Sequence, residues 1–251
     1  MSKIIPGAED FFYEGNQIGI LAIHGFTGTT QSMRSLGKAF ADAGFTVLGP
    51  RLTGHGISPE EMRNAEFKDW LQDVEEALDE LRLHADKIFI TGLSMGGALT
   101  LYLAEKYEDI LGIIPINAAI DMPAFKEFYQ TQRIANIEFI DGIGSDIKKP
   151  NVTELAYAKT PVKSMKELLD LMAIVRQDLS KIQCPALIFS STVDHVVPPE
   201  NSQTIYQDIS SHDKTLIPLH ESYHVATLDN DADLIATESI KFIREILASE
   251  I

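Results

Sequence analysis

Several features that define whole classes of protein are scarce in this chain. Its 251 residues include one cysteine, Cys184, so no internal disulfide can form, which fits a reducing compartment. Lys and Arg number 21 against 37 Asp and Glu, and the formal net charge is −16. Phosphate backbones and anionic membrane surfaces bind clustered cations. We therefore expect no nucleic-acid partner and no docking on an anionic bilayer.

Long apolar runs and cofactor motifs are absent as well. No stretch approaches the ~20 apolar residues of a membrane span, and segment 1–10 lacks the apolar stretch of a secretory signal. There is no Gly-x-x-x-x-Gly-Lys-Ser/Thr phosphate loop, and the glycine spacing at 92–97 does not fit a dinucleotide fingerprint. These absences predict a cytoplasmic globular protein without stable membrane insertion and without a cofactor.

Short apolar runs alternate with amphipathic segments along most of the chain. This alternation is typical of strand–helix–strand units, and almost wholly apolar runs indicate strands covered on both faces. The expected strands are 18–24, 46–50, 87–91, 111–117, 185–190 and 215–219. Segment 11–13, followed by Gly15 and Asn16, predicts an antiparallel hairpin at one edge. We expect an α/β fold with a mostly parallel central sheet flanked by helices.

One connection between strands is longer than a crossover helix requires. Helical periodicity covers 33–43, 67–83, 94–107, 162–181 and 233–247. The connection from Ile120 to Gln183 holds only one of these helices, where crossovers are usually much shorter. We therefore predict a helical cap at 121–161, inserted into a core formed by 1–120 and 162–251 and covering a site. The alternative is a helical excursion without a role at any site.

The strongest motif is Gly-x-Ser-x-Gly at 92–96, between an expected strand and an expected helix. This context is that of a nucleophile elbow, in which the serine occupies a strained turn. The residues two positions before and after the serine must be small, and Gly92 and Gly96 meet this requirement. We predict that Ser94 is a nucleophile. The alternative is a glycine-rich turn with an incidental serine.

A serine nucleophile needs a base, and the base needs an acid that orients it. In folds with this elbow, the acid and then the histidine follow the serine along the chain. Asp194 comes just past the expected strand 185–190, at the sheet edge where such a site forms, although it could also cap a local turn. Of seven histidines, His220 and His224 follow the last expected strand, and His224 has the longer reach. We predict Ser94, Asp194 and His224 as a catalytic triad.

The oxyanion of an acyl-transfer reaction needs two N–H donors. The N–H of Met95 opens the helix after the elbow, where the partial positive charge of the helix favours an anion. The second donor usually comes from a turn after an early strand, and His24-Gly25-Phe26 forms such a turn. We assign it to the N–H of Phe26. A simple tight turn at Gly25 and Gly28 is compatible with this role.

Residues 220–224 also match the zinc-peptidase pattern His-Glu-x-x-His. The pattern binds zinc only on a helix, where both histidines share one face. The preceding segment 215–219 resembles a strand, and Pro218 obstructs a helix through it. We expect no metal site, and a zinc peptidase is the least favoured alternative.

Taken together, the motifs resemble those of bacterial monoacylglycerol lipases, in the carboxylesterase group of the α/β-hydrolase superfamily. The similarity rests on the elbow and on 24–28, 51–56 and 222–229, with 143–150 and 154–161 inside the insertion. It extends over nearly the whole chain, while 121–136 matches less well. The resemblance implies an α/β-hydrolase fold with a helical cap.

The resemblance also implies a substrate. It carries over the same triad and oxyanion donors, and it places Ile143 and Glu154 against the glycerol side of a lipid ester. It implies hydrolysis of monoacylglycerols to fatty acid and glycerol through an acyl-enzyme, with no cofactor. A carboxylesterase for short-to-medium chains, a thioesterase and a non-catalytic binding protein on this scaffold are the alternatives. An apolar cap rim could also form a homodimer contact or touch lipid aggregates transiently.

Overall fold

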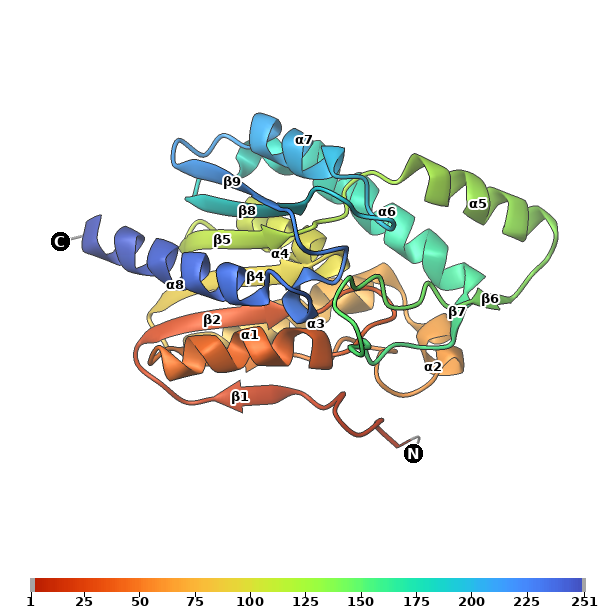
Figure 1. Ribbon diagram of the computed structural model, residues 1–251, viewed down its shortest axis with the longest axis horizontal. Coiled ribbons are helices and arrows are strands. Elements are labelled where there is room, and N and C mark those ends of the chain that lie inside the picture. Colours follow the sequence, from red (N-terminus) through yellow and green to blue (C-terminus); the bar gives the residue numbers. More distant parts are fainter. Residues whose placement is uncertain (1–2, 250–251) are drawn as a thin grey trace.

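A seven-stranded sheet forms the centre of the computed structural model, which describes residues 3–249 (Figure 1). The strand order is β1-β3-β2-β4-β5-β8-β9, and every neighbouring pair is parallel except β1 and β3. The strands are β1 (Phe11–Tyr13), β2 (Ile18–Ile23), β3 (Thr46–Gly49), β4 (Lys87–Leu93), β5 (Ile110–Ile116), β8 (Ala186–Ser191) and β9 (Lys214–Leu219). The mostly parallel sheet predicted from the apolar runs is therefore confirmed.

Helices cover both faces of the sheet (Figure 1). They are α1 (Gln31–Asp42), α2 (Pro59–Asn64), α3 (Phe67–Arg82), α4 (Met95–Lys106), α5 (Pro123–Ile134), α6 (Val162–Asp178), α7 (Glu200–Asp208) and α8 (Ala232–Ser249), with short 3₁₀ turns η1 (Leu179–Lys181) and η2 (Ala226–Leu228). Among the described residues, no helix is both long and apolar enough to span a bilayer.

The alternation of side chains along the strands divides the core into two layers. In β2, Ile20 and Ala22 pack with α1 and α8, whereas Leu21 and Ile23 face α3 and α4. Successive residues of a strand point to opposite faces, so one wholly apolar strand supplies both layers. This explains why the central strands read as continuous apolar runs.

The predicted hairpin is wrong, although the antiparallel edge strand exists. β1 pairs with β3 rather than with β2, the next strand in the chain. β2 already has β3 on one side and β4 on the other, so it offers no free edge to β1. The turn after β1 instead docks onto the start of β3, where Gly15 N–H donates to Thr46 Oγ1 at 3.0 Å.

The segment between β5 and α6 has two parts of different character. Helix α5 buries none of its side chains, rests on α6 and projects away from the sheet (Figure 1). The second part holds the short strands β6 (Phe139–Asp141) and β7 (Lys159–Pro161), joined by a loop that returns to the body. In that loop, Tyr157 donates its hydroxyl to Gly54 O at 2.8 Å and accepts from Ile57 N–H at 2.8 Å.

Leu81 and Leu83 provide a matched test of how the face of α3 packs. Leu81 is fully buried, whereas Leu83, just past the helix end, is 77% exposed. Leu81→Ala leaves a cavity and is expected to lower the free energy of unfolding by about 2–5 kcal/mol. Leu83→Ala is expected to change it by less than about 0.5 kcal/mol. Urea denaturation measures both, and equal effects would contradict this packing.

Candidate active site

Ser94 occupies a strained turn between β4 and α4. Its backbone has φ 59° and ψ −116°, a conformation that costs an L-residue about 1–3 kcal/mol. A Cβ added to Gly92 would lie 2.1 Å from Gly96 O, and one added to Gly96 would lie 2.2 Å from Ile23 O. Both positions therefore require glycine, as the elbow motif predicts.

His224 and Asp194 form a hydrogen-bonded pair at the carboxyl edge of the sheet. His224 Nδ1 lies 2.8 Å from Asp194 Oδ2, and both side chains are almost completely buried. The other oxygen of Asp194 accepts the N–H groups of Val196 and Val197, each at 2.8 Å. With Nδ1 facing the carboxylate, Nε2 is the nitrogen left to accept a proton in the predicted triad.

Burial and charge act in opposite directions on His224. Burial alone lowers its pKa, because the charged imidazolium loses solvation. Asp194, Glu154 and Asp146 outweigh burial, and the pKa of His224 is raised above its usual value. The arrangement therefore stabilises the imidazolium that forms when a histidine accepts a proton.

The turn after β2 is organised by a neutral histidine. Leu52 N–H donates to His24 Nε2 at 3.1 Å, which requires that Nε2 carry no proton. The proton is then on Nδ1, which lies 2.9 Å from Gly25 O. Burial, the largest influence, lowers the pKa of His24 to about 4, so the ring stays neutral and keeps this tautomer. His24 thereby fixes the backbone that leads into Phe26.

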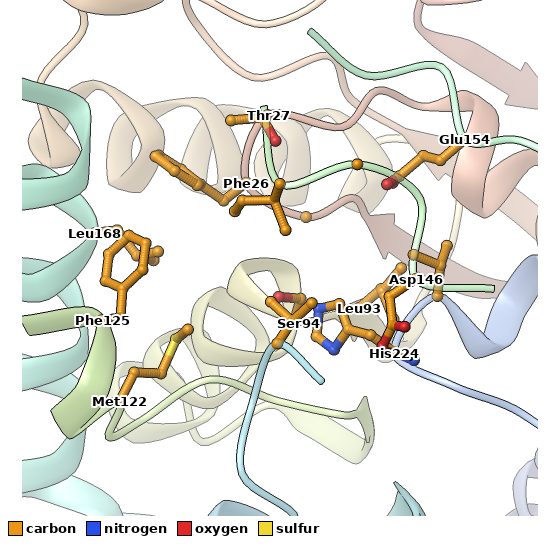
Figure 2. A pocket seen from close by; sticks show the side chains of 15 residues that line it. Phe26, Thr27, Leu93, Ser94, Met122, Phe125, Asp146, Glu154, Leu168 and His224 are labelled. Carbon is orange, nitrogen blue, oxygen red and sulfur yellow. Dashed lines mark hydrogen bonds between the residues drawn. The ribbon is translucent and has the colours of Figure 1, made fainter. Parts of the chain in front are cut away.

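A pocket opens between this turn, Ser94 and the segment that follows β5 (Figure 2). Ser94 and His224 line it together with Phe26, Ile143 and Glu154, so five of the predicted site residues meet there. Asp194 lies behind His224, and the N–H of Met95 begins α4, where it has no acceptor within the helix. Further apolar side chains complete the wall, and Met122 and Phe125 among them belong to the predicted cap: Leu93, Met122, Phe125, Leu168 and Val196.

Glu154 places its carboxyl group deep in the pocket although the residue as a whole is only half-buried. A Cβ on Gly28 would lie 2.5 Å from Glu154 Oε1, so glycine at 28 makes the space that this carboxyl occupies. Burial raises the pKa of Glu154 to about 7, against the opposing effects of His224 and the Ser32 hydroxyl. The group can therefore be either a donor or an acceptor near neutral pH.

Asn117, at the end of β5, was not predicted as a site residue. Its Nδ2 donates to His224 O at 2.7 Å and to Ser191 Oγ at 2.9 Å, while its Oδ1 accepts Ser191 N–H at 2.7 Å. It has φ 45°, a left-handed conformation that Asn adopts more readily than most residues. A polar Asn closing an apolar strand was the available signal.

The His-Glu-x-x-His segment does not have the geometry of a zinc site. Residues 220–224 follow β9 without helical structure, so His220 and His224 do not share a helix face. His220 is exposed, whereas His224 is buried against Asp194. Between residues 3 and 249, no cluster of three or more His, Cys, Asp or Glu is arranged to hold a metal ion.

Comparison with known proteins agrees with this geometry. The model of the family described as serine aminopeptidase, S33, matches residues 16–231. The thermostable monoacylglycerol lipase of Bacillus sp. (strain H-257) is 51% identical over 95% of both chains. The carboxylesterase of Bacillus subtilis (strain 168) is 30% identical over 98% of this chain and 99% of its own.

Solved structures support the same fold. A structure from work on two metagenome-derived lipolytic enzymes, LipS and LipT, has a TM-score of 0.93 at 47% identity and covers 97% of this chain and 100% of its own. A soluble variant of monoglyceride lipase from Saccharomyces cerevisiae has a TM-score of 0.77, at 18% identity and over 94% and 91% of the two chains. At that identity the second likeness concerns the fold alone. The predicted α/β-hydrolase fold is confirmed.

Glu154 and His224 should make stability depend on pH. Both have folded-state pKa values above their ordinary ones, so the stability they contribute at low pH is lost as pH rises through those values. For Glu154 the window runs from its usual 4.5 to about 7. We expect Glu154→Gln to reduce the fall in Tm between pH 5 and 7.5 by about a few degrees, measured by differential scanning fluorimetry. An unchanged pH dependence would contradict the burial of this carboxyl.

Proposed function

Because this chain belongs to the serine aminopeptidase S33 family of α/β-hydrolases, we propose that it hydrolyses monoacylglycerols to a fatty acid and glycerol at Ser94. The observation that carries the proposal is the His224–Asp194 pair facing the pocket that the elbow serine lines. The relative at 51% identity, named a monoacylglycerol lipase, supports the ester class and the substrate. The chain is thus a carboxylic ester hydrolase, and the reaction that we propose needs no cofactor.

In the first half of the reaction, Ser94 Oγ attacks the ester carbonyl as His224 Nε2 takes its proton. Asp194 keeps the Nδ1 proton in place and stabilises the imidazolium without becoming protonated itself. The carbonyl oxygen becomes an oxyanion held by the N–H groups of Phe26 and Met95, each contributing about 3 kcal/mol in comparable sites. The tetrahedral intermediate then collapses, glycerol leaves with the proton from His224, and an acyl-enzyme remains.

The second half repeats these steps with water. His224 removes a proton from a water molecule, and the hydroxyl attacks the acyl carbonyl while the same two N–H groups hold the oxyanion. The C–O bond to Ser94 then breaks and Ser94 recovers its proton from His224. The free fatty acid is the second product, and the enzyme returns to its initial state.

The substrate has two dissimilar ends, and the pocket has two dissimilar sides. Met122, Phe125 and Leu168 give one side an apolar lining suited to an acyl chain (Figure 2). Glu154 presents a carboxyl group on the other side, where it can pair with glycerol hydroxyls, and Ile143 also lines the pocket. We propose that 121–161 forms a cap over this pocket, on a core of 1–120 and 162–251.

A carboxylesterase with broader preference is the second candidate. The relative at 30% identity bears that name, and it shares nearly the full length of this chain. The catalytic chemistry would be identical, and only the leaving group would differ. Glu154 favours the glycerol ester, because a simple alkyl leaving group offers no hydroxyl to this carboxyl, which then keeps only the Ser32 hydroxyl as a hydrogen-bond partner. A thioesterase is disfavoured on the same ground.

The cellular location and the partners of the enzyme are proposed from its composition and exposed residues. We propose a cytoplasmic enzyme, since the single cysteine fits a reducing compartment, and no nucleic-acid partner, since the net charge is −16. Exposed apolar residues on and near the cap, Phe128 and Ile134 among them, suit a transient contact with lipid aggregates or a second copy of the chain.

Replacing Ser94 tests the reaction class. Ser94→Ala is expected to lower kcat on monoacylglycerols by at least about 10³-fold, because the nucleophile is lost. Fluorophosphonate should abolish wild-type activity, and a strong chelator should leave it unchanged. Chelator-sensitive activity that resists fluorophosphonate would contradict the proposal. An unchanged circular dichroism spectrum controls for folding of the variant.

Glu154 tests the substrate. Glu154→Leu is expected to reduce kcat/KM for a monoacylglycerol by about tenfold or more, since it removes a polar contact to the leaving group. It should change kcat/KM for the methyl ester of the same fatty acid by less than about threefold. Ser202 lies on α7, outside the pocket, and Ser202→Ala is the control for a substitution away from the substrate. Equal losses on both esters would favour the broader carboxylesterase.

A further inference from the structure

Asp146 joins the loop between β6 and β7 to the two loops that carry the predicted acid and base. It lies 49 residues before His195 and 78 before His224 in the chain. Its Oδ2 accepts the N–H of His195 and the N–H of His224, each at 3.1 Å, and its own carbonyl accepts Val225 N–H at 3.1 Å. One residue therefore binds the backbone beside Asp194 and the backbone of the base itself.

The geometry points to Asp146 as a positioning residue that holds His224 in register with Asp194 and places a third carboxyl group beside the histidine. This inference rests on the proposed function, in which His224 is the base. Asp146 acts through His224, and the proposal gives it no contact with the reacting atoms. It assigns to the loop after β6 a part in positioning the predicted base, in addition to covering the site.

The carboxyl group of Asp146 is well placed to stabilise a positive charge on the imidazole of His224. Its side chain is 15% exposed and lines the pocket, so solvent screens it only partly (Figure 2). The titratable groups facing His224 are Asp194, Glu154 and Asp146, and all three favour the imidazolium. The group facing Asp146 on its outer side is His195, whose Nδ1 lies 2.8 Å from Oδ1 and whose ring packs edge-on against Tyr223.

Asp229 anchors the same loop, so it provides a comparison for the role of Asp146. Asp229 accepts the N–H groups of Lys148, Lys149 and Tyr223 at 2.6 to 2.9 Å, which ties the same loop to the segment before His224. Asp229 has no hydrogen bond to His224 in the described structure. A role limited to anchoring would therefore give Asp146 and Asp229 the same phenotype.

The test is the acid limb of kcat/KM against pH, with a soluble p-nitrophenyl ester as substrate. This limb reports the pKa of the base in the free enzyme. Removing the Asp146 charge lowers that pKa, so the limb of Asp146→Asn should move to lower pH by about 0.5–1 unit. At the plateau, Asp146→Asn, which keeps an oxygen acceptor, should stay within about threefold of wild type, and Asp146→Ala should lose about tenfold.

Three comparisons make the outcome decisive. Asp229→Asn is expected to lower Tm without moving the acid limb. In His195→Ala, the His224 N–H still donates to Asp146, so the acid limb should not shift as it does in Asp146→Asn. The pH dependence of fluorophosphonate labelling at Ser94 should shift in the same way as kcat/KM, which frees the test from the choice of substrate. If Asp146→Asn does not fold, Asp146→Ser provides an uncharged acceptor with the same expected shift.

The result that would overturn the inference is specific. An unshifted acid limb in Asp146→Asn, or an equal shift in Asp229→Asn, would reduce Asp146 to an anchor. If the Asp146 test fails in this way while Ser94→Ala is inactive, the proposed function still stands. Activity that persists in Ser94→Ala would instead contradict the proposed function itself.

Discussion

The close crossing of β4, α4 and β2 is the constraint on which the site depends. Gly92 and Gly96 let the elbow fold against itself, and Gly96 also lies against the end of β2 at Ile23 O. The strained backbone of Ser94 and the turn that carries Phe26 are thereby placed from a single packed junction. Because this junction is built from the central strands β2 and β4 and from α4, we expect the predicted nucleophile and both proposed oxyanion donors to keep their spacing.

The three carboxyl groups around His224 differ in their hydrogen-bond partners. Asp194 and Asp146 each have an oxygen satisfied by backbone N–H groups, so both carboxylates are stabilised before the histidine becomes charged. Glu154 lacks such backbone donors in the described contacts and is shifted toward its neutral form by burial. The surroundings of His224 thus combine two carboxyl groups that accept backbone N–H groups with a third, Glu154, and only Glu154 is directed toward the proposed leaving-group side.

The sequence was most informative where the signal is local. The elbow needs small residues at fixed spacing, and the buried strands need continuous apolar runs, so Ser94 and the sheet could be predicted. Pairings between distant segments leave no such pattern. β1 pairs with β3 because β2 has no free edge, and Asn117 and Asp146 act through backbone groups dozens of residues away. The roles of the triad, the oxyanion donors, Ile143 and Glu154 remain predictions that the geometry supports.

The two parts of segment 121–161 differ in how much of the molecule depends on them. The loop between β6 and β7 is tied to the body through Asp146, Tyr157 and Asp229, whereas α5 buries none of its side chains and rests on α6. Apart from Phe125, which packs against the core and lines the pocket, sequence change in α5 therefore carries little penalty for folding. Natural drift or laboratory evolution can reshape the acyl-chain side of the pocket there, while the loop keeps the reaction centre constant.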